Sequence, residues 1–239
     1  MYPSAMLTAI VAMGLLLAGA SGDPNFTSYP EVLLARAAEA TETCPEVRAA
    51  IERVSPLVGS RDFEAFALAT AMTESRCQSR AWNPSDGRAA RIGSTRSSRW
   101  STAWAPLPAY QWGSGGLYGF LPTTALSSCA SWCDPAWIFD PQISTLLLAE
   151  YARSIQRNYL SRLPPEKRTW LAVRKSMAGL EYLYDVDDQL DASRRMRARF
   201  EARLSEAGFD PGLADRRVDL RRFRGLADSL RDLAQNSGS

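Results

Sequence analysis

FALATAMTESR, at residues 66–76, is the most informative segment of this 239-residue chain. Together with Phe63, it is apolar over most of a helical surface, which is typical of a helix buried in the centre of a protein. Ser60 precedes the segment as a candidate N-cap, so a helix is expected from there to about Arg76. The sequence therefore predicts a buried central helix that carries Glu74 near its C-terminal end.

Helical patterns lie on both sides of this segment, and no strong strand pattern is present. Upstream, residues 31–59 contain helical patterns that Cys44-Pro45 and Ser55-Pro56 interrupt. Downstream, Asp140-Pro141 has the form of an N-cap followed by proline, which predicts a helix start. The apolar stripe expected on that helix consists of Ile143, Leu147, Tyr151, Ile155 and Tyr159.

Further helices are expected over residues 168–184, 188–207 and 213–234, with Gly208 as the stop between the last two. The last pattern rests on apolar residues spaced by three and four: Leu220, Phe223, Leu226, Leu230 and Leu233. The arginines of this part favour a solvated helix surface with i,i+4 ion pairs, and binding to an anionic polymer is the alternative. The expected fold class is mainly α.

Residues 83–115 have a different composition, with glycine, serine, arginine and proline between aromatic residues. A loop of this length is usually functional or disordered, and a small hairpin is expected in residues 83–120. Six of the seven tryptophans fall in or near it: Trp82, Trp100, Trp104, Trp112, Trp132 and Trp137. Such rings suit stacking on sugar faces, and anchoring of a loop-rich core is the equal alternative.

The composition excludes several kinds of chemistry. The chain has no histidine, which removes a Ser-His-Asp triad and the commonest metal ligand. The net charge of +2 gives no strong field, so no nucleic-acid partner is expected. Cys44, Cys77, Cys129 and Cys133 favour disulfides over zinc, in any of three pairings. Neither a metal nor an organic cofactor is expected.

The first 22 residues have the pattern of a targeting segment. They are apolar and uncharged from Ala5 to Ala20, and Ala18-Gly19-Ala20 has the form of a cleavage site. The alternative is an uncleaved N-terminal anchor, which would be the chain's only attachment to a membrane. Both predict an exported protein that is periplasmic or extracellular, or anchored to the inner membrane.

Glu74 is the candidate catalytic residue on physical grounds. A carboxyl group beside apolar surface resists ionisation. A carboxylic acid that keeps its proton can donate it to a glycosidic oxygen. The structural alternative is a helix-end glutamate paired with Arg76 or Arg80. Asp86 and Asp134 are weaker candidates for a second acid if the reaction is hydrolysis.

Four elements in a fixed order resemble the soluble lytic transglycosylases and goose-type lysozymes of the lysozyme-like superfamily. The first is the apolar helix that ends in Glu74-Ser75, followed by Trp82-Asn83-Pro84. The second is the turn and helix start GLYGFLPTTA at residues 116–125. The third is Asp140-Pro141 with Tyr151 on the helix that follows, and the fourth is Ala178-Gly179.

The resemblance implies a lysozyme-like transglycosylase domain over residues 23–185, with residues 186–239 as an Arg-rich helical extension. It implies cleavage of the β-1,4 bond from N-acetylmuramic acid to N-acetylglucosamine, with Glu74 as the single catalytic acid and a 1,6-anhydro product. The implied substrate-binding residues are Ser75, Trp82, Trp112, Gly116, Leu117, Tyr118, Tyr151 and Ser176.

The sequence departs from the family pattern at two places. The family usually has glutamine where this chain has Gly119, and Tyr-Asn where it has Ser176-Met177. Tyr118, Tyr151 or Tyr182 would have to supply a replacement hydroxyl. These departures favour the alternative hypothesis, a peptidoglycan-binding or scaffold protein of the same fold with weak or no catalysis. A third hypothesis is an envelope or phage assembly component that binds a partner protein through residues 186–239.

Overall fold

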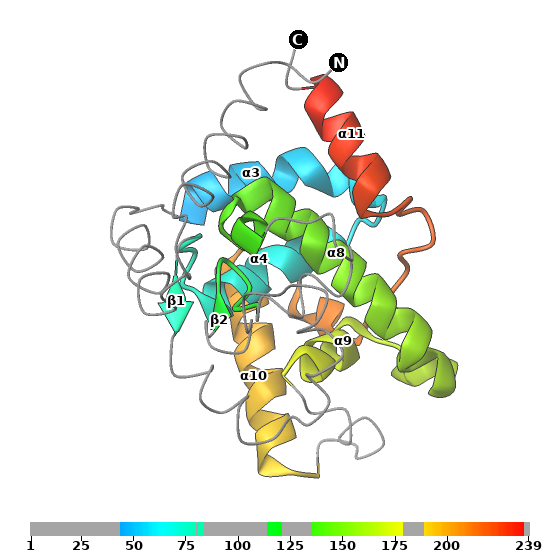
Figure 1. The fold of residues 1–239 in the computed structure, drawn as a ribbon. Helices are drawn as coiled ribbons and strands as arrows, with labels where there is room; N and C mark the ends of the chain where they lie inside the picture. The colour runs from blue at the N-terminus through cyan, green and yellow to red at the C-terminus, as the bar shows by residue number, and fades with distance from the viewer. Residues whose placement is uncertain (1–43, 80, 84–113, 121–134, 179–188, 237–239) are drawn as a thin grey trace, which may run out of the picture.

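The fold is described from a computed structural model, and the described residues are 44–79, 81–83, 114–120, 135–178 and 189–236 (Figure 1). This part of the chain is mainly helical, as the sequence predicted. Its α-helices are α3 (Cys44–Val58), α4 (Phe63–Glu74), α8 (Pro141–Asn158), α9 (Trp170–Met177), α10 (Asp191–Glu206) and α11 (Leu226–Asn236). None of these helices combines the length and hydropathy needed to cross a membrane. The expected targeting segment, residues 1–22, lies outside the described residues.

Helix α4 lies in the middle of the molecule and contacts α3, α8 and α10 (Figure 1). Nearly every residue from Phe63 to Met72 is buried, which confirms the prediction of a buried central helix. The Phe66 ring lies between two aromatic partners, with its centroid 4.7 Å from that of Trp170 and 6.0 Å from that of Phe200. Because α4 is apolar on all sides, helices must cover it on all sides.

The predicted start of this helix was wrong by two residues. The N-cap is Asp62, whose side chain makes no capping hydrogen bond, and Ser60 instead accepts from the Phe63 N–H through its backbone oxygen at 3.3 Å. Burial of Phe63 fixes the helix start, since its ring packs 6.4 Å from that of Trp170. Tertiary packing therefore overrides the local capping preference of Ser60.

Helix α3 begins at Cys44, and it continues through Pro56, where the sequence predicted an interruption. Pro56 lies in the last turn, where the loss of one backbone donor breaks few hydrogen bonds. Val54 and Val58, on either side of it, are fully buried and hold this turn against the core. Gly59, with φ of +70°, then ends the helix.

Helix α8 starts as predicted. The Asp140 carboxylate accepts hydrogen bonds from the N–H groups of Gln142 at 2.9 Å and Ile143 at 2.8 Å, and Pro141 occupies the first turn. The expected stripe is buried at Ile143, Leu147 and Ile155 and partly buried at Tyr151. Tyr159 is 45% exposed, so its assignment to the stripe was wrong. The helix ends at Asn158, one residue before it.

The structure shows α9 only over Trp170–Met177, within the helix expected at 168–184. Thr169 caps it by accepting a hydrogen bond from the Ala172 N–H at 3.3 Å. Trp170 is completely buried against Phe63 and Phe66. Residues 179–184 lie outside the described residues. The packing of Trp170 on Phe63 and Phe66 fixes helix α9 against the central helix α4.

Helix α10 confirms the helix expected at 188–207, and Gly208, with φ of +84°, ends it. The single helix expected at 213–234 was wrong. A short 3₁₀ helix (η8, Pro211–Asp215) and an extended segment precede α11. In that segment the Val218 N–H donates to the Arg168 oxygen at 2.9 Å, and the Arg216 oxygen accepts from the Trp170 N–H at 3.1 Å. These long-range backbone bonds replace the helical ones.

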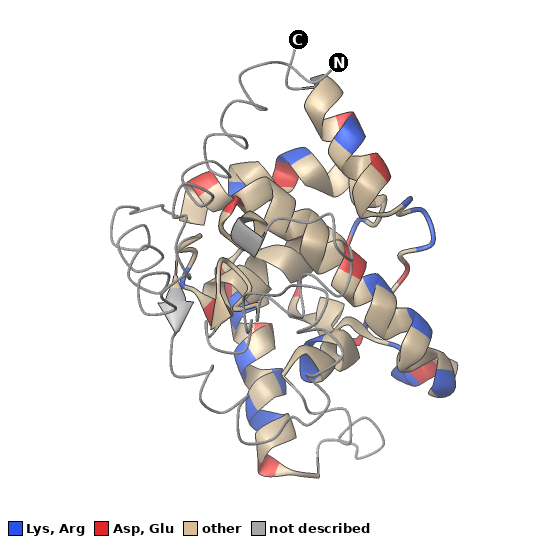
Figure 2. Ribbon diagram, in the orientation of Figure 1, with Lys and Arg blue, Asp and Glu red and all other residues tan. Residues whose placement is uncertain are grey.

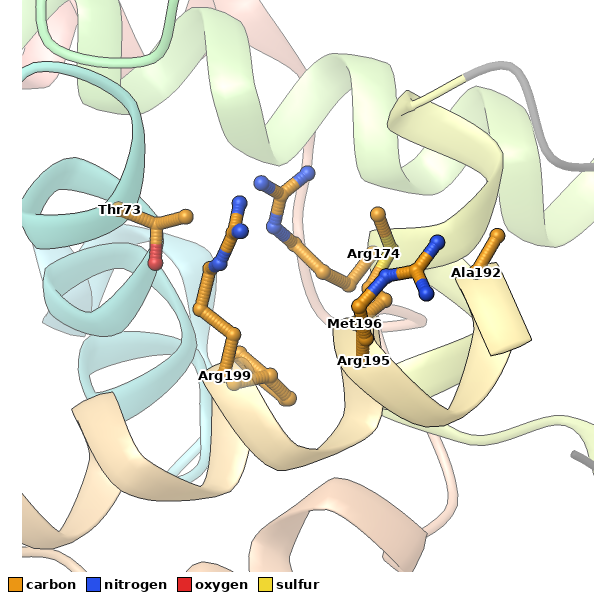
Figure 3. A pocket seen from close by; sticks show the side chains of 7 residues that line it. Thr73, Arg174, Ala192, Arg195, Met196 and Arg199 are labelled. Atoms are coloured by element: carbon orange, nitrogen blue, oxygen red, sulfur yellow. The ribbon is translucent and has the colours of Figure 1, made fainter.

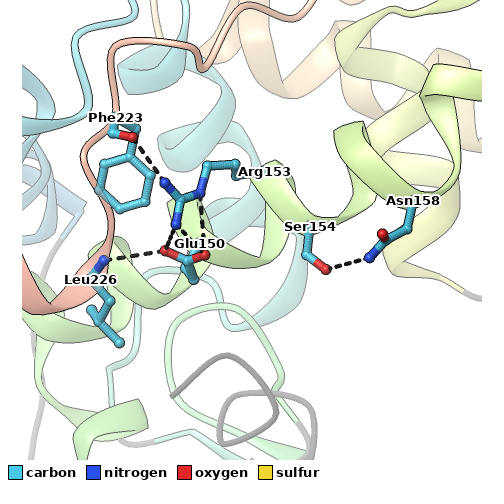
Figure 4. Close-up of polar contacts among 6 residues, drawn as sticks. All are labelled: Glu150, Arg153, Ser154, Asn158, Phe223 and Leu226. Atoms are coloured by element: carbon cyan, nitrogen blue, oxygen red, sulfur yellow. Dashed lines mark hydrogen bonds and ion pairs between the residues drawn. The ribbon is translucent and has the colours of Figure 1, made fainter. Parts of the chain in front are cut away.

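The C-terminal segment is anchored to α8 by a polar network around Glu150 (Figure 4). Arg153 binds the Glu150 carboxylate and also donates to the Phe223 oxygen at 3.0 Å, with its guanidinium 5.0 Å from the Phe223 ring centroid. The Leu226 N–H, at the start of α11, donates to Glu150 at 3.2 Å. Residues 189–236 therefore pack onto the same helices as the rest of the core.

Two short strands meet where a hairpin was expected. β1 (Trp82–Asn83) pairs antiparallel with β2 (Ser114–Gly115), with Trp82 opposite Gly115 and Asn83 opposite Ser114. The pairing joins the two ends of the Trp-rich segment. Residues 84–113, between the strands, lie outside the described residues. The coarse expectation of strand pairing in this region is confirmed.

Candidate functional site

Glu74 is the last residue of α4, and a tightly constrained turn follows it. The backbone N–H groups of Ser75 and Cys77 both donate to the Ala71 oxygen, at 3.0 and 3.3 Å. Arg76 and Cys77 have φ of +55° and +64°, a region that residues other than glycine rarely adopt. A disulfide joins Cys77 to Cys44 at the start of α3. The turn that follows the candidate acid is thus held to α4 by backbone hydrogen bonds and to α3 by the disulfide.

The Glu74 carboxylate forms an ion pair with the guanidinium of Arg174 on α9. The Arg174 side chain is only 6% exposed, whereas that of Glu74 is 31% exposed. The sequence alternative of an ion pair was correct in kind, but the partner is 100 residues away instead of at Arg76. Arg80, the other candidate, lies outside the described residues. Glu74 is therefore a partly accessible carboxylate held by a buried cation.

Gly119 approaches Glu74 from the turn after β2. This turn is closed by two backbone hydrogen bonds of 2.9 Å between Gly115 and Phe120. A Cβ placed on Gly119 would lie 3.3 Å from the Glu74 Oε2 atom, and φ at Gly119 is +60°. The position at which the chain departs from the family's glutamine therefore lies directly against the candidate acid. Glycine there leaves space beside the carboxylate.

Three of the predicted substrate-binding residues form this turn, but they point elsewhere. Gly116, with φ of +74°, has no room for a side chain because a Cβ would lie 2.0 Å from the Ile138 oxygen. Leu117 is a fully buried core residue. The Tyr118 hydroxyl is buried and makes a 2.7 Å hydrogen bond with Thr145. The buried residues Leu117 and Phe120, on either side of Gly119, thus hold the turn in place.

Burial raises the pKa of Tyr118 well above its ordinary value of 10.0, an effect that the hydrogen bond to Thr145 only partly offsets. The hydroxyl is therefore a neutral structural group at physiological pH. It does not replace the missing family tyrosine beside Glu74.

The structure also describes three further residues that were predicted to bind substrate. Ser75 is buried and donates from its Oγ atom to the Ala71 oxygen at 3.0 Å. Tyr151 is half-buried on α8, with its ring centroid 6.0 Å from that of Phe120. Ser176 is buried on α9, two residues after Arg174. Of these residues, Ser75 and Ser176 are near the ion pair in sequence.

Several predicted residues cannot be placed in the site. Trp82 belongs to β1, but its side chain lies outside the description. The other residues outside the described part are Trp112, Trp100, Trp104, Trp132, Tyr182, Asp86, Asp134, Cys129 and Cys133. Trp137 is half-buried in the short 3₁₀ helix η4 (Pro135–Phe139). A sugar-stacking role for the tryptophans remains a prediction.

A pocket of about 210 Å³ lies next to the ion pair, between α4, α9 and α10 (Figure 3). We call it the three-arginine pocket, because Arg174, Arg195 and Arg199 line it together with Thr73, Ala192, Met196 and Phe200. Arg174 reaches it from α9, and the other two arginines reach it from α10. Basic residues recur along α10 (Figure 2). The pocket could not be predicted from the sequence, because residues 174 and 195 come together only through the packing of α9 and α10.

The described residues contain no group of three or more histidine, cysteine or acidic side chains that could hold a metal ion. Comparison of the chain with protein-family models, curated proteins and solved structures finds no match. Its functional interpretation therefore rests on the geometry at Glu74 and on the sequence motifs.

Proposed function

We propose that the protein cleaves peptidoglycan glycan strands with Glu74 as proton donor, in the manner of a lytic transglycosylase. The observation that carries the proposal is the meeting of three segments at one carboxyl group. The end of α4 provides Glu74, the turn after β2 brings Gly119 against it, and α9 provides Arg174. Two of these segments, the end of α4 and the turn after β2, carry motifs on which the family resemblance rests.

The reaction would proceed in two steps at this carboxyl. In its acid form Glu74 donates a proton to the glycosidic oxygen as the bond to C1 breaks. The acetamido oxygen of the substrate stabilises the positive charge that develops at C1. Glu74, now a carboxylate, then takes the proton of the C6 hydroxyl, whose oxygen attacks C1 and closes the 1,6-anhydro ring. One carboxyl is enough, whereas most glycoside hydrolases need two.

Arg174 has a defined role in this scheme. A guanidinium forms stronger hydrogen bonds with a carboxylate than with a neutral acid, because both partners are then charged. Arg174 would therefore stabilise Glu74 after proton donation, when the carboxylate must act as the base. For the first step, the ion pair has to loosen when the sugar binds and Glu74 takes up a proton.

The ion pair also favours a second candidate function. A carboxylate held by a buried arginine contributes to stability without any catalysis, and Tyr118 does not supply a hydroxyl at the site. The second candidate is therefore a peptidoglycan-binding protein of the same architecture that does not cleave its ligand.

Clearing of a suspension of purified peptidoglycan separates the two candidates. Wild-type protein should clear it, and Glu74→Gln should slow clearing by at least about 100-fold, as expected for loss of a general acid. Glu64→Gln, in the first turn of the same helix, is the matched control and should clear at the wild-type rate. Equal clearing by wild type and Glu74→Gln would exclude the catalytic role. Binding without clearing by any of the three proteins would establish the second candidate.

A further inference from the structure

The arginines of α10 fall into two groups according to their partners. Three of them pair with acids: Arg194 with Asp191, Arg197 with Asp215 and Glu201, and Arg203 with Glu206. Arg195 and Arg199 both line the three-arginine pocket. Within the described part of the chain, neither of these two has a hydrogen bond or an ion pair. Among the described residues, the cations of this helix that have no acidic partner are thus those that face the pocket.

The three guanidinium groups that line the pocket repel one another. Arg195 and Arg199 are four residues apart, and like charges at this spacing destabilise a helix. Arg174 adds a third, buried guanidinium, and among the residues that the structure describes Glu74 offsets one of the three charges. An anion bound between them would relieve the repulsion. Guanidinium groups fit carboxylates and phosphates well because their donors form a planar fork.

The remaining lining of the pocket limits what kind of anion fits. Phe200, Met196 and Ala192 supply an apolar wall, and Thr73 lines the side of α4 with its hydroxyl donating to the Ala69 oxygen at 2.8 Å (Figure 3). A volume of about 210 Å³ is large enough for a carboxylate with a short aliphatic stem. An amino-acid residue has this combination of charge and apolar surface.

On the basis of the proposed peptidoglycan substrate, we propose that the three-arginine pocket binds a free carboxylate of the peptide attached to the glycan strand. The peptides of peptidoglycan carry several such carboxylates. Arg174 connects this site to the candidate acid, because a guanidinium has enough donors to bind Glu74 and a second carboxylate together. Peptide binding would thereby position the strand relative to Glu74.

Isothermal titration with a soluble disaccharide tetrapeptide tests this inference without turnover, because the ligand lacks the bond to be cleaved. The proteins are wild type, the double variant Arg195→Gln/Arg199→Gln, and Arg194→Gln as a control from the same helix. Arg195 and Arg199 are exposed, so the double variant should fold, which a thermal melt checks. The ligands are the peptide with free carboxylates, the same peptide with amides in their place, and inorganic phosphate.

The double variant should bind the free-carboxylate ligand at least about tenfold more weakly than wild type, or about 1.4 kcal/mol. Arg194→Gln should bind it like wild type. Wild type should bind the amidated ligand as weakly as the double variant does. Equal affinity of wild type for the free and amidated ligands would overturn the inference. So would a loss of affinity in Arg194→Gln as large as that in the double variant. Binding of phosphate with no binding of the peptide would overturn the assignment to a peptide carboxylate.

The same titration on Glu74→Gln separates this inference from the proposed enzyme activity. Its affinity for the free-carboxylate ligand should stay within about threefold of wild type, since a neutral amide still leaves all three arginines in place. Unchanged clearing by Glu74→Gln would exclude the catalytic role while leaving arginine-dependent binding intact. If the double variant binds the free-carboxylate ligand like wild type while wild type still clears peptidoglycan, only the inference about the pocket would be excluded.

Discussion

Gly119 and Glu74 lie so close that a Cβ on residue 119 would be 3.3 Å from the Glu74 Oε2 atom. The turn that bears Gly119 is closed by Gly115 and Phe120 and is anchored in the core by Leu117. The space next to the candidate acid is therefore set by backbone and not by a long side chain. A substrate oxygen that approaches Glu74 would have to share this space.

Substitution Gly119→Ala should affect both stability and activity. The positive φ should cost about 1–2 kcal/mol of unfolding free energy in urea. Gly208→Ala is the matched control, because φ there is +84° and no atom lies within 4 Å of the added Cβ. Both variants should lose similar stability, but only Gly119→Ala should clear peptidoglycan more slowly. Equal clearing by the two variants would show that the space beside Glu74 is unimportant.

The ion pair between Glu74 and Arg174 should contribute to stability in a way that a double-mutant cycle can measure. With Glu74→Gln and Arg174→Gln, the coupling energy from urea unfolding should be about 1–3 kcal/mol, because the arginine is buried. The exposed pair of Asp191 and Arg194 is the control, and its coupling should be below about 0.5 kcal/mol. Similar coupling in both pairs would contradict the burial of Arg174.

The disulfide between Cys44 and Cys77 should stabilise the fold and hold the turn after Glu74. It closes a loop across a separation of 33 residues, for which loop entropy predicts about 3–4 kcal/mol. The double variant Cys44→Ser/Cys77→Ser should lose that much in urea unfolding, and peptide mapping without reduction should recover a fragment that joins the two cysteines. A fragment joining Cys44 to Cys129 or Cys133 would contradict the structure.

Tyr118 predicts a pH dependence of stability on the alkaline side. Its folded-state pKa is raised above the ordinary 10.0, so its contribution is complete below pH 10 and is lost as the pH rises further. Tyr118→Phe should lose about 1 kcal/mol at pH 7 through the broken hydrogen bond to Thr145. Between pH 10 and 11.5 its stability should fall less steeply than that of wild type. Parallel decline of both proteins in urea titrations would contradict the burial of this hydroxyl.

The sequence predicted the elements whose signals are local. The apolar run of α4 and the Asp140-Pro141 start of α8 both appear where they were expected, because burial on all sides and side-chain capping leave traces in adjacent residues. Gly208 likewise ends α10 through its own backbone conformation. Such features do not depend on distant parts of the chain.

The failures depend on contacts between distant segments. The apolar spacing at Leu220 and Phe223 suggested a helix, yet these two residues close a single turn, and residues 216–218 before them bond to residues 168–170. Arg174 as the partner of Glu74, and its meeting with Arg195 and Arg199, follow from the packing of α9 and α10. No pattern in neighbouring residues reveals such a convergence.

Mass spectrometry of the fragments released from purified peptidoglycan tests the central claim most directly. Wild-type protein should release disaccharide peptides with 1,6-anhydro ends, which are one water lighter than hydrolysis products. Glu74→Gln should release almost none of them, and Glu64→Gln should match wild type. Anhydro-ended fragments in equal amounts from wild type and Glu74→Gln would contradict the account.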